Sequence, residues 1–234
     1  MVDIDLLNRM TGIADLNKTD KVLEIGTGTG NLTVYLQKIA KHVYCIEKDK
    51  DLLDQVKHRF QHCKNITFIH DDAVHAKFPE FNKCVSNLPY TICEPLLWKF
   101  TRCAFECLVF VVPKKFAELL LGEKPSRLKL LADAFYNVEF IELVPPQAFD
   151  PQPKVNSALI KITPRKDGNF FLKEFFSQYD KKTKNALREM LMKSGLTKSE
   201  AAEQIMLKIR PAIHEKNIVT LSLEEIKEIV KAFS

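Results

Sequence analysis

Residues 21–33 read KVLEIGTGTGNLT: a short apolar strand, a turn with glycines at 26, 28 and 30, and the start of a helix. A strand, a glycine turn and a helix in this order open the βαβ unit of a nucleotide-binding α/β fold. The glycines permit a tight turn and a close approach of the backbone to a ligand. The third glycine comes one residue early for the G-x-G-x-x-G pattern. By itself, therefore, the turn also fits an ordinary strand-to-helix connection.

The next two expected strands each end in acidic residues. A strand over residues 42–46 ends at Glu47, 17 residues after the last glycine. This is close to the spacing at which an acid accepts hydrogen bonds from ribose hydroxyls. A helix is expected from residue 50 to about 61, then a strand over 65–70 that ends in Asp71-Asp72-Ala73. Each acid alone fits a helix cap or a solvated turn, but two acids in register with the glycine turn favour a nucleoside ligand.

A fourth strand over residues 83–86 leads into Asn87-Leu88-Pro89-Tyr90 at the same sheet edge, where ligands of open α/β sheets bind. The side-chain oxygen of Asn87 and the backbone carbonyl beside Pro89 are acceptors suited to an exocyclic amine. Tyr90 offers a stacking face, worth about 1–3 kcal/mol per base. Pro89 lacks an N–H and stiffens the turn. Alone, these four residues fit an ordinary strand-to-loop turn equally well.

The remainder of the first domain alternates helices and strands around a proline-rich loop. Residues 145–154 hold four prolines, which fix an extended path, with Phe149 in the middle and Lys154 at the end. Phe149 fits two interpretations, a core side chain or a second stacking face opposite Tyr90, with Lys154 near a phosphate. Helices are expected at 3–17 (with Ile4, Leu7, Ile13 and Leu16 facing the core), 31–40, 94–101, 114–121 and 127–136, and strands at 108–112 (the most apolar, expected to be central), 138–144 and 155–162.

From residue 169 onward only helical periodicity is present, and we place the domain boundary in the charged turn 163–168. The expected domains are therefore 1–165 and 166–234. Lys181, Lys182, Lys184 and Arg188 form a basic cluster, which fits a solvated surface or a phosphate-positioning patch. Helices are expected at 170–178, 181–194, 198–208 and 222–233, with Thr197 or Ser199 capping the third and Ser222 the last.

Composition narrows the class of protein. Of the 234 residues, 46% are hydrophobic, which is enough for a sizeable core. Charged residues make up 28%, and the net charge of +5 weakly favours a polyanionic partner. No run of about 18 apolar residues predicts a membrane span, and the first residues lack the blocks of a signal peptide. The six cysteines form no C-x-x-C pair, so reduced thiols in a cytoplasmic protein are expected, and no metal site.

These motifs together resemble those of the ribosomal RNA adenine N6-dimethyltransferases, the small-subunit dimethyladenosine transferases. The resemblance covers roughly residues 20–165 and is looser beyond. Its most specific parts are residues 87–90 (NLPY) and residues 145–157 (PPQAFDPQPKVNS). It implies a Rossmann-like class I methyltransferase sheet with helices on both faces, an S-adenosylmethionine-dependent domain, and a small all-helical C-terminal domain that binds RNA.

The resemblance also assigns roles to residues. It implies a catalytic motif formed by Asn87, Leu88, Pro89 and Tyr90, with Phe149 as a wall of the target-base pocket. It implies S-adenosylmethionine contacts from Gly26, Gly28, Gly30, Asn31, Leu32, Glu47, Lys48, Asp72, Ala73 and Asn87. Small-subunit ribosomal RNA, or the pre-ribosomal small subunit, is the implied partner, contacted by Arg127, Lys154, Lys181, Lys182, Lys184 and Arg188. We expect a monomer that acts in the cytoplasm without a membrane.

One departure keeps other functions open. Family members carry a Gln-x-Phe-Leu type box before the first helix, whereas this sequence begins MVDIDLL. A non-catalytic ribosome-assembly factor on the same fold is therefore one alternative, marked by cofactor binding without methyl transfer. A DNA adenine methylase would share the chemistry, but such enzymes more often have other residues at the second and third motif positions. A nicotinamide dehydrogenase would leave residues 87–90 unexplained.

Overall fold

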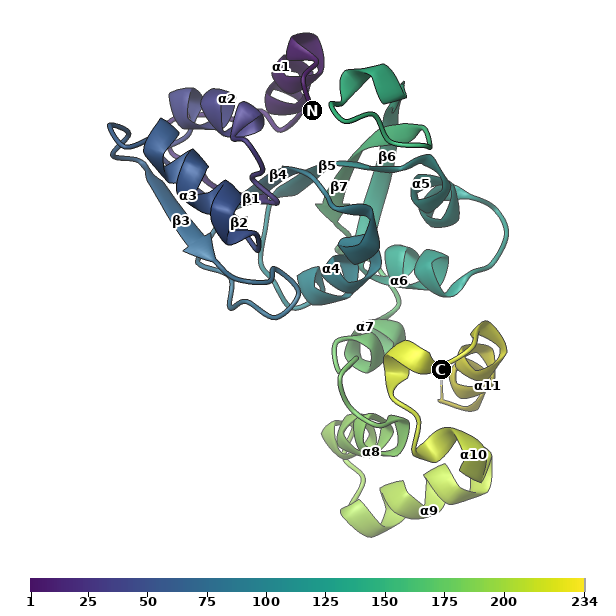
Figure 1. Cartoon of the computed structure of the whole chain (residues 1–234). Coiled ribbons are helices and arrows are strands. Elements are labelled where there is room, and N and C mark those ends of the chain that lie inside the picture. Colours follow the sequence, from purple (N-terminus) through teal and green to yellow (C-terminus); the bar gives the residue numbers. More distant parts are fainter. Residues whose placement is uncertain (234) are drawn as a thin grey trace. The chain divides into compact units, whose positions relative to one another are not determined.

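The computed structural model describes residues 1–233 and contains a seven-stranded sheet in the order β3-β2-β1-β4-β5-β7-β6 (Figure 1). The five strands from β3 to β5 are parallel, and β7 runs antiparallel to β5. Crossing from β1 to β4 reverses the direction of winding, which creates a switch point where ligands of such sheets bind. The strands are β1 Lys21–Ile25, β2 His42–Glu47, β3 Ile66–His70, β4 Lys83–Asn87, β5 Cys107–Pro113, β6 Tyr136–Val144 and β7 Ser157–Pro164.

The described residues form two compact units. One comprises Met1–Leu121 and Asn137–Pro164, and the other Gly122–Tyr136 together with the residues from Arg165 onward. The segment Gly122–Tyr136, which lies in the first domain of the sequence-based division at residue 165, thus groups with the C-terminal helices. The first unit holds α1 Ile4–Ile13, α2 Asn31–Ile39, α3 Lys50–Arg59, α4 Cys93–Phe100 and α5 Lys114–Leu121; the second holds α6 Arg127–Phe135, α7 Phe170–Phe176, α8 Thr183–Lys193, α9 Lys198–Lys208, α10 Pro211–His214 and α11 Leu223–Phe233.

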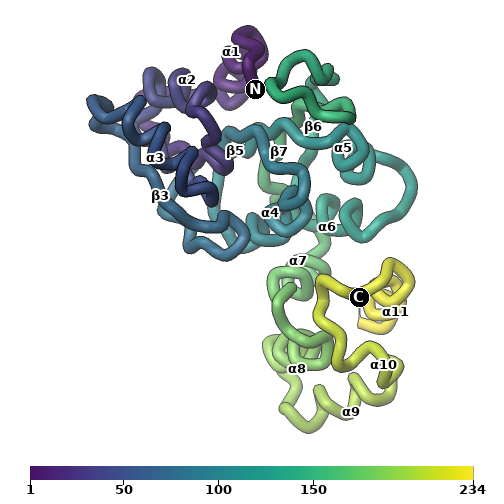
Figure 2. Tube along the Cα trace, in the orientation of Figure 1, coloured from purple at the N-terminus to yellow at the C-terminus, as the bar shows by residue number. Residues whose placement is uncertain are grey.

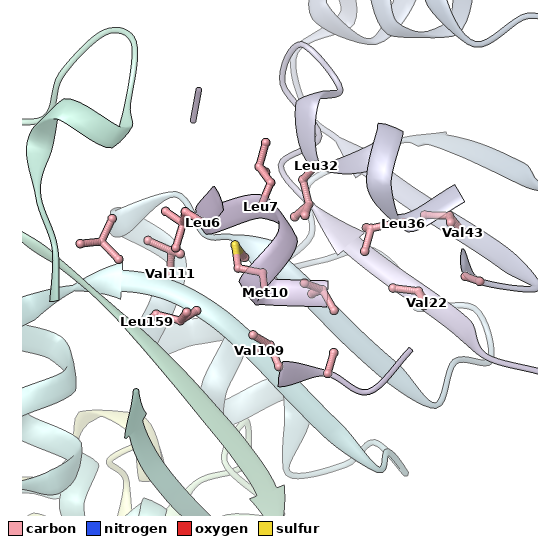
Figure 3. Close-up of a cluster of buried hydrophobic side chains, with 14 of the residues drawn as sticks. Leu6, Leu7, Met10, Val22, Leu32, Leu36, Val43, Val109, Val111 and Leu159 are labelled. Atoms are coloured by element: carbon pink, nitrogen blue, oxygen red, sulfur yellow. The ribbon is translucent and has the colours of Figure 1, made fainter. Parts of the chain in front are cut away.

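One face of the sheet is covered by α1 and α2. Leu6, Leu7 and Met10 of α1 are at most 2% exposed and lie over side chains of the central strands (Figure 3). Leu32 and Leu36 of α2 join the same cluster. Burying a leucine side chain contributes about 1.5–3 kcal/mol, so these contacts fix α2, and with it the glycine turn before α2.

The opposite face is covered by α4. Phe100 is 1% exposed, and its ring centroid lies 5.7 Å from that of Phe110 on β5. Leu96 and Leu97 of α4 are also buried. Helices therefore cover both faces, as expected. All residues of β5 except the last, Pro113, are buried, and the strand lies in the interior of the sheet between β4 and β7.

The first helix is shorter than the sequence predicts. It ends at Ile13, and Asp15 follows with a φ of 47°, in the left-handed region that terminates helices. The expectation that Ile4 faces the core is wrong, because Ile4 is 61% exposed. The other three expected contacts are confirmed: Leu7 is 2% exposed, and Ile13 and Leu16 pack against the core cluster that also contains Leu6 and Met10.

The second unit is helical. Its helices α8 and α9 follow one another in the sequence and are also in contact (Figure 2). The predicted caps are present. The Thr197 side chain and Glu200 form a capping box at α9, and the Ser222 hydroxyl accepts a hydrogen bond from the Glu225 N–H at 3.2 Å. The sequence prediction missed α10, which has only four residues and therefore little periodicity.

Three compositional expectations can be compared with the structure. Four of the six cysteines are buried, and all six are free thiols. Within residues 1–233, no helix combines the length and apolar character that a bilayer crossing requires. The same residues contain no group of three or more His, Cys, Asp or Glu side chains that could hold a metal ion.

Candidate active site

The glycine turn between β1 and α2 is shaped by conformation and by close packing. Gly26, Gly28 and Gly30 have φ values of 73°, 54° and 80°, which side-chain-bearing residues rarely adopt. A Cβ atom on Gly26 would lie 3.2 Å from the Cδ atom of Pro89. A Cβ on Gly28 would meet no atom within 4 Å, so this part of the turn faces open space. The turn therefore packs against the NLPY motif on one side and leaves a gap for a ligand on the other.

Glu47, at the end of β2, is tied to this turn. Its Oε2 atom accepts a hydrogen bond from the Gly28 N–H at 2.9 Å, and its Oε1 atom accepts one from the Asp49 N–H at 2.9 Å. The residue is 8% exposed. Two backbone donors thus hold a carboxylate at the sheet edge, as the strand spacing predicts.

Two cavities meet at this edge. The smaller has an empty volume of about 390 Å³ and is lined by the glycine turn, Asn31 and Leu32. The larger, about 800 Å³, is lined by Glu47, the NLPY residues and the proline-rich loop. Gly26, Gly28 and Asn87 line both cavities.

Asn87 carries an unsatisfied acceptor. Its Oδ1 atom is buried and has no hydrogen-bond partner in the protein. Leaving a buried polar atom unpaired costs roughly 1–3 kcal/mol, so such an atom calls for an explanation. Because Asn87 lines both cavities, a ligand with an N–H group would supply the partner. Thr27, on the wall of the smaller cavity, has an equally unpaired Oγ1 atom.

The aromatic walls of the larger cavity are Tyr90 and Phe149. The Tyr90 hydroxyl hydrogen-bonds with the hydroxyl of Ser157, a fully buried residue on β7. Phe149 is 6% exposed and packs in the core cluster beside α1, yet it also lines the cavity. The two interpretations of Phe149 are thus compatible, because one part of the ring is buried and another reaches the cavity.

Glu24, on β1, is a candidate site residue that was not predicted from the sequence. It is 2% exposed and lines the smaller cavity. Its Oε2 atom accepts hydrogen bonds from the Thr33 hydroxyl at 2.6 Å and from the Cys45 thiol at 3.4 Å. Burial raises the pKa of Glu24 to about 8. An acid in the middle of an apolar strand is the sequence signal that would have identified it.

Some predicted cofactor residues lie beside the cavities but not on their walls. Lys48 forms a 2.8 Å ion pair with Asp72, which lowers the pKa of that carboxyl, and Ala73 is buried. The Asp71 N–H donates to the Glu47 carbonyl at 3.2 Å, so the loop after β3 begins next to the cavity. Neither cavity is lined by Gly30, Lys48, Asp72 or Ala73.

The predicted basic residues are mostly paired. Lys181 forms a 2.6 Å ion pair with Glu189, and Lys182 and Lys184 both pair with Glu215. The Arg188 guanidinium donates to the side-chain oxygen of Asn185 at 3.0 Å. Arg127 donates to the Val219 carbonyl, and Lys154 is exposed in the proline-rich loop. The cluster from 181 to 188 is therefore not a bare basic patch, because Glu189 and Glu215 form ion pairs with three of its lysines.

Comparisons with known proteins agree on one family. The chain is 35% identical over 234 residues to a "Probable ribosomal RNA small subunit methyltransferase A" of Pyrococcus abyssi, a match that covers 96% of this chain and 86% of the relative. The crystal structure of a dimethyladenosine transferase from Plasmodium falciparum superposes with a TM-score of 0.70 at 27% identity, over 100% of this chain and 96% of that one.

The fold extends to a more distant structure. The 23S rRNA methyltransferase ErmE superposes with a TM-score of 0.66 at 20% identity, over 98% of this chain and 97% of that one, a likeness of fold alone. The family described as "Ribosomal RNA adenine dimethylase" matches residues 1–233. The chain therefore belongs to the ribosomal RNA adenine dimethylase family.

Proposed function

We propose that this protein transfers methyl groups from S-adenosylmethionine to the N6 atoms of adenosines in small-subunit ribosomal RNA, and that two transfers give dimethyladenosine. The observation that supports this most directly is the unpaired Oδ1 atom of Asn87, on the shared wall of the two cavities. An acceptor at this position can bind an amine substrate in the larger cavity, next to a cofactor in the smaller cavity. Family membership supports the same reaction.

The residues around the glycine turn fit the cofactor. The open face of Gly28 admits a ligand close to the backbone, and Glu47 offers carboxylate oxygens for ribose hydroxyls. The unpaired Thr27 hydroxyl and the Glu24 carboxyl supply further polar groups in the smaller cavity. When bound, S-adenosylmethionine supplies an electrophilic methyl group on a positively charged sulfur.

The chain's own contribution is to hold the target amine. The nitrogen lone pair of adenine N6 is delocalised into the ring, which makes the amine a poor nucleophile. We propose that Asn87 Oδ1 accepts one N6 hydrogen and the Leu88 carbonyl the other, which favours a more tetrahedral nitrogen. The Leu88 N–H donates to the Val111 carbonyl at 3.1 Å, so the motif is anchored to β5. Positioning of this kind accounts for a large part of the catalysis of bimolecular reactions.

The target adenine must leave its stack to reach this pocket. Tyr90 and Phe149 offer two aromatic faces that offset part of the unstacking cost, at about 1–3 kcal/mol per stacked base. The hydrogen bond between the Ser157 and Tyr90 hydroxyls restrains the Tyr90 ring. We therefore assign Tyr90 and Phe149 to base binding, with Pro89 keeping the motif rigid.

The distribution of charge supports RNA binding by the second unit. That unit carries 17 lysines and arginines against 12 aspartates and glutamates, whereas the first unit carries 18 of each. The net charge of +5 therefore belongs wholly to the second unit, as expected for a surface that attracts a polyanion. Within the second unit we assign phosphate contacts to Arg127, Lys181, Lys182, Lys184 and Arg188; Lys154 would add one near the cavity. Action as a monomer in the cytoplasm stays a prediction.

Labelled methyl transfer tests this proposal. The protein is incubated with radiolabelled S-adenosylmethionine and small ribosomal subunits from cells that lack adenine dimethylation. We expect label in the ribosomal RNA of these subunits and none in fully methylated subunits. Cofactor binding without any transfer would contradict the proposal and favour a non-catalytic assembly factor. Equal transfer to duplex DNA would favour a DNA adenine methylase.

A further inference from the structure

Lys99, on α4, is connected to the loop that follows β3. Its half-buried ammonium group donates hydrogen bonds to the backbone carbonyls of Ala73 at 2.6 Å and Val74 at 3.1 Å, and also to that of Ala76. A lysine ammonium has three N–H donors, and here each has a carbonyl acceptor in one loop of four residues. Hydrogen bonds from a charged donor are about twice as strong as neutral ones.

The same loop is fastened at its other end to the candidate cofactor site. The Asp71 N–H donates to the Glu47 carbonyl at 3.2 Å. The Asp72 carboxylate accepts from the Val74 N–H at 3.0 Å, and the Asp72 carbonyl accepts from the Ala76 N–H at 2.7 Å. The loop is thus a compact turn. It begins beside Glu47, and three of its carbonyls accept hydrogen bonds from Lys99.

An aromatic ring completes the surroundings of the ammonium group. The Lys99 Nζ atom lies 3.9 Å from the ring centroid of Phe78, a distance typical of a cation–π contact. The Phe78 ring in turn lies 5.6 Å from that of Phe100, which is buried under the sheet. Burial lowers the pKa of Lys99, while Cys103, Asp71 and Asp72 act in the opposite direction. The lysine is therefore a built-in connection between α4 and the loop, not a solvated side chain.

We propose that Lys99 is a positioning residue that fixes residues 72–76 in the conformation that receives the adenine of the cofactor. The proposal rests on the proposed function, and on the cofactor contacts of Asp72 and Ala73 that the family resemblance implies. Lys99 does not touch the ligand in this scheme. It fixes the carbonyls of Ala73, Val74 and Ala76 through its three N–H donors, and so preorganises the Asp72–Ala73 segment.

Lys99→Met, which keeps the stem and removes the three donors, tests this inference. Lys99→Gln, which keeps a side-chain amide donor, is a second and milder variant. Lys115→Met, at an exposed lysine of α5, is the matched control. Two measurements are made on each full-length protein: backbone amide exchange without ligand, and S-adenosylmethionine affinity by calorimetry.

We expect faster exchange at residues 73–77 in Lys99→Met, with unchanged exchange in β1 and β4. The dissociation constant for S-adenosylmethionine should rise about tenfold, equivalent to about 1.4 kcal/mol, and KM should rise with kcat unchanged. Lys99→Gln should show a smaller change in the same direction, Lys99→Arg should restore binding, and Lys115→Met should resemble wild type.

Unchanged amide exchange in the loop would overturn the positioning role. Faster loop exchange with wild-type cofactor affinity would show that the connection only stabilises the fold, and would overturn the link to the cofactor. A wild-type protein that fails to bind S-adenosylmethionine would instead refute the proposed function, and the exchange data would still report separately on the loop. Loss of exchange protection in the whole sheet would assign Lys99 to global stability and contradict the inference.

Discussion

The Glu47 carboxylate accepts a hydrogen bond from the Gly28 N–H at 2.9 Å, although the two residues belong to different βα units. This bond connects the end of β2 to the turn between β1 and α2. It places a negative charge beside backbone atoms that approach the candidate ligand, at the switch point of the sheet. The bond thus connects two parts of the candidate site to each other.

The first prediction concerns this bond. Glu47→Ala removes the acceptor of two backbone N–H groups and the carboxylate proposed for the ribose. We expect S-adenosylmethionine affinity to fall about 10- to 100-fold, since a hydrogen bond to a charged group is worth roughly 1.5–3 kcal/mol. Calorimetry measures this, and Glu118→Ala, at an exposed acid of α5, serves as the control. Wild-type affinity in Glu47→Ala would remove Glu47 from the cofactor site.

The second prediction separates catalysis from cofactor binding. Asn87→Ala removes the unpaired acceptor proposed to hold the target amine. We expect methyl transfer to fall at least about 100-fold, the usual effect of losing one preorganised polar group, while cofactor affinity changes little. The exposed Asn8, replaced in the same way, is the matched control. Unchanged turnover in Asn87→Ala would refute the assignment.

The third prediction concerns pH. Burial raises the pKa of Glu24 to about 8 from its ordinary value of 4.5, so the folded protein keeps a proton that the unfolded chain releases. The free energy of unfolding should therefore decrease as pH rises from about 4.5 to about 8. Glu24→Gln should remove this decrease and be the more stable protein at pH 8, by roughly 1–3 kcal/mol. Urea unfolding at several pH values measures both, and an identical pH dependence in the two proteins would contradict the prediction.

The fourth prediction separates the two contributions of Phe149. Phe149→Leu keeps an apolar side chain in the core cluster but removes the aromatic face from the larger cavity. We expect a stability loss below about 1.5 kcal/mol, together with a several-fold rise in KM for the RNA substrate. Cofactor affinity should not change. If KM for RNA also stays at the wild-type value, Phe149 is a core residue only.

The fifth prediction tests the two paired lysines at the start of α8. Glu215 forms ion pairs with Lys182 and Lys184, which lower its pKa to about 2. Glu215→Gln should free both cations, increase RNA affinity several-fold and steepen its decrease with salt by up to about 1.4 in the log–log slope. Filter binding over a range of salt concentrations measures this. No change in slope would show that this surface does not contact RNA.

Family, fold class and most helices and strands could be predicted from the sequence because their signals are local. The glycine turn, the apolar strand before it and the polar residues at strand ends all lie within a few residues of one another. Parallel strands then bring Glu47 and Asn87 to one edge, which topology alone predicts. The catalytic and cofactor roles of these residues remain predictions.

Long-range pairings could not be predicted in this way. Lys99 contacts carbonyls 23 to 26 residues away, and Tyr90 contacts Ser157 across 67 residues. The ion pairs of Lys182 and Lys184 with Glu215 could not be predicted for the same reason, because Glu215 is more than 30 residues away in the sequence. The exposure of Ile4 is a different error, confined to the first residue of α1, since Leu7, Ile13 and Leu16 of the same prediction do contact the core.

The most direct test of the central claim is nucleoside analysis of small-subunit ribosomal RNA after incubation of undermethylated subunits with the protein and S-adenosylmethionine. The nucleosides are separated by chromatography and identified by mass. The proposed function predicts N6,N6-dimethyladenosine, absent when Asn87→Ala replaces the wild type. RNA that contains only unmodified adenosine, despite measured cofactor binding by the wild-type protein, would contradict it.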